Sequence, residues 1–118
     1  MIGTIRRFDS PDVDNLSTWQ PAEPDCFGFL LQIMVGPASE EGEESFGIEV
    51  CTPAWLARKY GPHGIISGRH HLIVFEYEFK TIESYLRDYV ASCSADTWQE
   101  VAAKIGRLGH WEFEDYRP

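Results

Sequence analysis

Three segments in the first half of the chain alternate between apolar and polar positions in the way that is typical of β-strands. Residues 2–8 are rich in β-branched side chains, and residues 46–51 alternate as a half-buried strand does. Residues 27–35 carry apolar side chains on both faces, which is typical of a strand in the middle of a sheet. The first half is therefore predicted to supply three strands, of which the second is central in its sheet and buried on both sides.

Two polar segments separate these strands. Residues 9–24 are rich in Asp, Ser, Pro and Asn, and they predict a long loop around Trp19. Gly36 and Pro37 end the second strand, and residues 38–45 form a connection that contains four glutamates. Both segments are predicted to lie at the surface.

The second half of the chain contains three helical patterns. Thr52 and Pro53 start the first, because a capping hydroxyl followed by proline suits a helix N-terminus, and the helix should end by Tyr60. Apolar residues spaced by three and four predict the second helix over 82–93. A capping box opens the third helix, which is predicted over 97–108.

Two further strands are predicted between and after these helices. Residues 72–79 alternate, with one wholly apolar face and another that changes from apolar to acidic. Residues 111–113 form a closing strand in which Trp111 and Phe113 should point into the core beneath the last helix.

The order of these elements predicts an α+β protein. We expect an antiparallel or mixed sheet of about five strands, with two C-terminal helices packed on one face and one further short helix. A chain of 118 residues has the usual size of one domain, so residues 1–118 are expected to form a single domain.

Charge is distributed unevenly along the chain. The net charge is −9, and residues 8–57 contain no lysine or arginine. The acids in that stretch are Asp9, Asp12, Asp14, Glu23, Asp25, Glu40, Glu41, Glu43, Glu44 and Glu49. Such a field repels nucleic acid and anionic membranes and attracts basic partners. The charge pattern therefore excludes nucleic acid as the main partner.

Several features indicate the compartment. No apolar run reaches the ~18 residues that a membrane-spanning helix requires. No apolar stretch follows Arg6 and Arg7, so no secretory signal is predicted. Three widely spaced cysteines fit reduced, buried side chains better than disulfides, and these are Cys26, Cys51 and Cys93. We expect a soluble protein of the cytoplasm.

Motifs of well-known catalytic sites are missing from the sequence. No glycine-rich phosphate loop is present. His70 and His71 start a predicted strand, so they should point to opposite faces and not bind one ion together. Cys51 and His70 could be imagined as a nucleophile and base, but nothing near Cys51 makes it electropositive. We therefore predict no catalytic residue, no cofactor and no metal site.

Four glutamates leave an alternative open. If the last two predicted strands are neighbours, their carboxylates share one face of the sheet, as in an acid/base or metal site. Such a face would suit a small enzyme or a metal-binding domain. Alternation of this kind is also ordinary on a solvated sheet face. The residues concerned are Glu76, Glu78, Glu112 and Glu114.

Several long segments resemble one known family. They are 10–21 (SPDVDNLSTWQP), 41–56 (EGEESFGIEVCTPAWL), 68–77 (GRHHLIVFEY) and 97–116 (TWQEVAAKIGRLGHWEFEDY). Together they resemble the immunity protein 8 family of bacterial polymorphic-toxin systems. The resemblance implies an antidote, encoded beside a secreted toxin, that protects the producing cell by binding the toxin's C-terminal domain. It implies no catalytic residues.

The acidic half of the chain suggests where such a partner would bind. Nuclease toxins are common in these systems and are often basic, which agrees with an acidic partner surface. The crowded carboxylates of the 38–45 connection are the first candidates, and those near the C-terminus are the second. The candidate toxin-binding residues are Glu40, Glu41, Glu43, Glu44, Glu112, Glu114 and Asp115.

Overall fold

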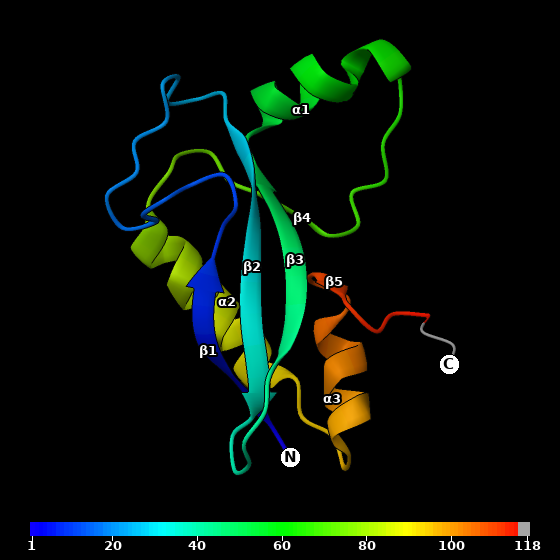
Figure 1. Ribbon diagram of the computed structural model, residues 1–118. Coiled ribbons are helices and arrows are strands. Elements are labelled where there is room, and N and C mark those ends of the chain that lie inside the picture. Colours follow the sequence, from blue (N-terminus) through cyan, green and yellow to red (C-terminus); the bar gives the residue numbers. More distant parts are fainter. Residues whose placement is uncertain (116–118) are drawn as a thin grey trace.

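The computed structural model describes residues 1–115 (Figure 1). The strands are β1 (Gly3–Asp9), β2 (Gly28–Pro37), β3 (Glu44–Cys51), β4 (His71–Ile73) and β5 (His110–Trp111). The helices are α1 (Pro53–Tyr60), the 3-10 turn η1 (Gly61–His63), α2 (Phe79–Ser92) and α3 (Trp98–Ile105). The strands form one sheet in the order β1-β2-β3-β4, and β5 pairs with β3 beside β4. The first three strands are antiparallel and β4 runs parallel to β3, so the sheet is mixed and the α+β prediction is confirmed.

One face of the sheet carries the core. Phe29, Leu31, Ile33 and Val35 of β2 are buried, as the alternation predicted. The helices α2 and α3 cover this face with stripes of apolar residues, and α2 lies behind the sheet in Figure 1. The helix residues buried there are Ile82, Leu86, Val90, Val101, Ala102 and Ile105.

A β-bulge in β1 keeps two apolar residues on the covered face. Ile5 pairs with Val35 and Phe8 pairs with Ile33, so β1 uses three residues where β2 uses two. The extra residue shifts the alternation, and Phe8 then makes an edge-to-face contact with Phe79 at 5.5 Å. The bulge therefore joins the edge strand to the start of α2.

Trp19 anchors the long loop that follows β1. Its ring meets those of Phe27, Phe29 and Tyr77 edge to face, at centroid distances of 5.7, 5.2 and 4.8 Å. The Tyr77 hydroxyl also donates to the carbonyl of Leu16. These contacts fix the loop against one end of the core.

The fourth strand is much shorter than its pattern predicted. The prediction of a strand over 72–79 is wrong beyond Ile73, because the partner strand β3 ends at Cys51, which pairs with Ile73. The next residues form a loop, and the Glu78 carboxylate accepts from the Lys80 amide to cap α2. Phe75 consequently lies 80% exposed and not in the core.

The closing strand is also displaced. Trp111 is half-buried and stacks on Phe46 at 6.3 Å with an interplanar angle of 13°, so it packs against the core as predicted. Phe113 is 41% exposed, and its predicted core position is wrong. The reason is a turn after Trp111, in which the Glu114 amide donates to the Trp111 carbonyl and ends the alternation.

The second face of β2 is more open than predicted. The strand is central, as expected, but Leu30, Gln32 and Met34 are only half-buried. No helix of residues 1–115 is long and apolar enough to span a membrane.

Candidate functional site: the acidic hairpin and the open face of the sheet

Arg6, the bulged residue of β1, organises the acidic connection between β2 and β3. Its Nε donates to the carbonyl of Gly42 at 3.0 Å. One terminal nitrogen donates to the carbonyls of Pro37 and Glu40 at 2.8 and 2.6 Å. A guanidinium with several fixed donors thus holds the loop at three points. The hairpin presents its acids from a defined backbone.

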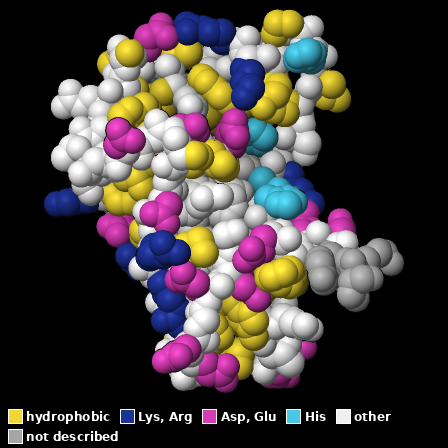
Figure 2. All heavy atoms as spheres, in the orientation of Figure 1, with side chains coloured by type: hydrophobic (Ala, Val, Ile, Leu, Met, Phe, Trp, Pro, Cys, Tyr) yellow, Lys and Arg dark blue, Asp and Glu magenta, His cyan; other side chains and the backbone are white. Residues whose placement is uncertain are grey.

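The four glutamates of this hairpin have different surroundings. Glu43 pairs with Arg7 at 2.7 Å, and Glu44 accepts from Trp111 Nε1 at 2.7 Å. Glu40 and Glu41 are exposed, and neither carboxylate has a partner among residues 1–115. Figure 2 shows acidic side chains at the lower end of the molecule, where Figure 1 places this hairpin. Two of the four acids therefore support the fold, and two face solvent.

We predict that Gly36→Ala disturbs this hairpin. A Cβ at Gly36 would lie 1.9 Å from the Gly42 carbonyl oxygen and 2.6 Å from Arg6 Nε, so the loop backbone must move. The expected loss of stability is about 1–3 kcal/mol in denaturant unfolding. Gly47→Ala is the matched control, because its Cβ would meet only Leu30 Cδ1 at 3.5 Å. Equal unfolding curves for both variants would contradict the described hairpin.

One of the C-terminal acids, Glu112, lies beside the end of the acidic hairpin. The Glu112 carboxylate accepts from the Ser45 amide at 2.9 Å, and the Glu112 amide donates to the Ser45 carbonyl at 3.2 Å. Glu114 forms a two-pronged ion pair with Arg69, and Asp115 is exposed. The structure thus places Glu112 next to Ser45, the residue that follows Glu44. The proposal that these acids contact a toxin remains a prediction.

A groove of about 400 Å³ crosses the open face of the sheet. Its lining comes from β2, β3, β5, the end of α1 and the start of β4. The lining residues are Leu30, Gln32, Ser45, Gly47, Glu49, Tyr60, His70, His71, His110 and Glu112. Figure 2 shows histidines in the middle of this face with acidic side chains beside them. Sequence reasoning missed this groove, because its walls come together only through the pairing of β3 with β4 and β5.

The two adjacent histidines were expected to point to opposite faces by strand alternation, but this alternation does not apply to His70. His70 precedes the strand with a φ of 66°, in the left-handed region, so the alternation of a strand begins only at His71. Both residues line the groove. His70 Nε2 donates to the Gly106 carbonyl at 2.8 Å, and His71 Nδ1 donates to the Arg69 carbonyl at 3.0 Å. Residues 1–115 contain no cluster of three His, Cys, Asp or Glu placed to hold a metal ion.

The alternative site of four glutamates does not form. Glu76 and Glu78 lie in the loop before α2, and Glu112 and Glu114 lie in the turn after β5. None of the four lies within a strand, because both predicted strands end early. The shared carboxylate face is therefore absent.

Burial also argues against a nucleophilic Cys51. Burial, with a smaller contribution from the charge of Glu49, raises the pKa of this thiol to about 11. Burial likewise raises the pKa of Cys93. A nucleophilic cysteine requires the opposite shift, because the thiolate is the reactive form.

Thiol reactivity tests this assignment. At pH 8 we expect Cys26, which is half-buried, to react first with a disulfide reagent, and Cys51 and Cys93 to react only as the protein unfolds. The Cys51 shift also predicts a loss of stability as pH rises from 9 to about 11, because the thiol ionises first in the unfolded chain. Rapid labelling of Cys51 in a Cys26→Ser variant would contradict its burial.

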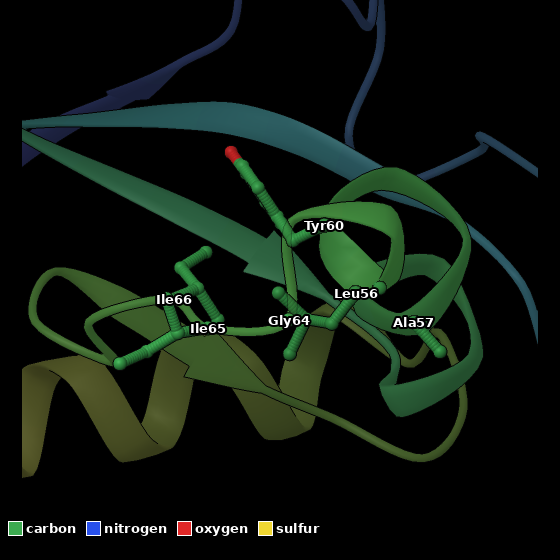
Figure 3. Close-up of a pocket in the computed structure, with 7 residues that line it drawn as sticks. Leu56, Ala57, Tyr60, Gly64, Ile65 and Ile66 are labelled. Carbon is green, nitrogen blue, oxygen red and sulfur yellow. The ribbon is translucent and has the colours of Figure 1, made fainter.

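A second hollow lies under α1 and is largely apolar. It measures about 390 Å³ and is lined by Leu56, Ala57, Tyr60, Gly61, Gly64, Ile65 and Ile66. Figure 3 shows Leu56, Ala57 and Tyr60 of α1 beside Gly64, Ile65 and Ile66 of the segment that follows. Ile65 is 84% exposed. The signal for this hollow in the sequence is the Ile-Ile pair in a loop rich in glycine.

Comparison with known proteins identifies the family. The model of the family Immunity protein 8 matches residues 3–116. No curated protein and no solved structure gives a significant match. The chain belongs to the Immunity protein 8 family, as the resemblance of its segments indicated.

Proposed function

We propose that this protein binds and neutralises the C-terminal domain of a cognate secreted toxin, in the cytoplasm of the bacterium that produces both. Its family membership carries the proposal, because the match covers nearly the whole chain. The partner domain is basic in this proposal, which agrees with a net charge of −9. A basic nuclease would fit this description.

The acidic hairpin supports this proposal as the docking element. Glu40 and Glu41 are exposed, and Arg6 fixes the backbone that carries them. An ordered loop loses less conformational entropy on binding than a mobile one. Exposed charges at the rim of an interface mainly accelerate association. The hairpin would therefore steer the toxin toward the open face of the sheet.

The geometry gives no support to an enzymatic function. The four glutamates of the alternative site do not share a face, and Cys51 has a raised pKa. We therefore propose inhibition by binding, with no chemical step.

A titration of toxin activity tests this function. The C-terminal domain of the toxin encoded beside this gene is purified and its activity is measured with increasing amounts of this protein. We expect activity to fall to zero at a fixed molar ratio, because a tight complex removes the toxin stoichiometrically. A protein of similar charge and size from outside the family is the control. Full toxin activity at a tenfold excess would overturn the proposed function.

A further inference from the structure

We propose that the groove on the open face of the sheet holds an arginine or lysine side chain of the protein partner. The inference rests on the proposed function, because the partner is the toxin domain. It adds a second contact to the interface, distinct from the acidic hairpin, with a different kinetic role.

The shape of the groove suits one long side chain. Gly47 lies in the lining without a side chain, between Leu30 on β2 and the segments at the β3 edge. A Cβ at Gly47 would meet only Leu30 Cδ1 at 3.5 Å, so the space above the strand is open. An aliphatic stem can lie on Leu30 and Gly47 while its charged end reaches the walls.

Two lining residues of the groove, Glu49 and Tyr60, already contact a cationic side chain of the same chain. Lys59 Nζ lies 3.7 Å from Glu49 Oε1 and 4.6 Å from the centroid of the Trp55 ring. It also lies 5.4 Å from the centroid of the Tyr60 ring. A carboxylate beside two aromatic faces attracts ammonium and guanidinium groups. A partner cation in the groove would share Glu49 with Lys59.

The opposite wall supplies a second, fixed carboxylate. Glu112 Oε1 is held by the Ser45 amide, and Oε2 has no hydrogen-bond partner within residues 1–115. His70 and His71 each use one ring nitrogen to donate to a backbone carbonyl, so the other nitrogen of the neutral ring is an acceptor. The carboxylates of Glu49 and Glu112 are the charged acceptors among the lining residues. Arginine offers five donors and no acceptor, which makes it the best complement.

The test replaces both carboxylates of the groove. E49Q/E112Q keeps the shapes of both side chains, and the amide oxygen introduced by E112Q can still accept from the Ser45 amide. The matched control is D88N/E100Q, which removes the same charge from exposed positions on α2 and α3. Binding to the toxin domain is measured by stopped flow and by surface plasmon resonance. Thermal unfolding confirms that each variant folds.

We expect E49Q/E112Q to dissociate about thirtyfold faster or more, with an association rate within about twofold of wild type, because desolvated charge pairs act mainly on dissociation. The control should change the dissociation rate less than about twofold. Lys59→Met should slow dissociation relative to Lys80→Met, because it removes a competing cation beside Glu49. Equal dissociation of E49Q/E112Q and its control, or equal dissociation of the two lysine variants, would overturn the groove as a cation site.

The outcomes separate this inference from the function on which it rests. If wild type binds the toxin and the groove variants behave as their controls do, the inference fails and the proposed function stands. If wild type does not bind the toxin, both are overturned. A loss of association rate alone in E49Q/E112Q would also overturn the inference, because it would show steering without occupation of the groove.

Discussion

Replacing Phe46 with alanine is expected to lower the free energy of unfolding by about 3–5 kcal/mol, the usual cost of emptying a buried aromatic position. Phe46 is fully buried and pairs with Ile33 on one side and Trp111 on the other. Its ring stacks on that of Trp111, so the substitution leaves a cavity where β5 joins the sheet.

Trp111→Ala provides the comparison for Phe46→Ala. Trp111 is half-buried, so its removal should cost less, about 2 kcal/mol, despite the lost hydrogen bond to Glu44. Urea unfolding measures both variants. A loss below about 1 kcal/mol for Phe46→Ala would contradict the described packing of β5.

The second large effect concerns the acidic hairpin. Replacing Glu40 and Glu41 with glutamine is expected to slow association with the toxin domain about tenfold at low salt, because the lost charges no longer steer a basic partner. The difference should shrink at high salt, where screening already weakens the steering. The melting temperature should stay within a few degrees of wild type, since neither carboxylate has a partner within residues 1–115.

A second variant of the hairpin separates steering from folding. E43Q/E44Q removes the same charge, but it also removes the ion pair with Arg7 and the charge of the acceptor for Trp111. It should lower the melting temperature more than E40Q/E41Q does. Equal association rates for wild type and E40Q/E41Q at low ionic strength would eliminate this hairpin as the docking element.

The sequence predicted the covered face of the sheet well. The alternation over β2 and β3 reflects burial on one side by α2 and α3, and burial is what the period of two records. The capped starts of α1 and α3 were also correct, because Thr52 and Thr97 accept from the amides three residues on. These features depend on residues that are close together in the chain.

Most of what the local patterns did not predict depends on contacts between distant parts of the chain. The strand over 72–79 needed a partner, and its pattern does not record that β3 ends at Cys51. The histidine pair was assigned by alternation, although His70 adopts a left-handed backbone. The organisation of the hairpin by Arg6 joins residues 31 to 36 positions apart. Long-range pairing decided the length of β4 and the organisation of the hairpin, and a local pattern carries no information about it.

Part of the candidate site could be predicted from the sequence. The acids of the hairpin were visible as a run in the sequence, and their exposure follows from a loop that turns at the edge of the molecule. Their division into two structural and two exposed carboxylates depends on Arg7 and Trp111, which come from opposite ends of the chain. The groove depends on four separate segments beside β3. Only the three-dimensional structure brings them together.

Protection of living cells tests the central claim most directly. Bacteria carrying an inducible gene for the C-terminal toxin domain are grown with this protein, with an unrelated immunity protein or with an empty vector. We predict that this protein restores growth after induction and that the two controls do not, because the antidote acts by binding its own toxin. Equal loss of growth in all three cultures, with this protein produced in folded form, would contradict the account.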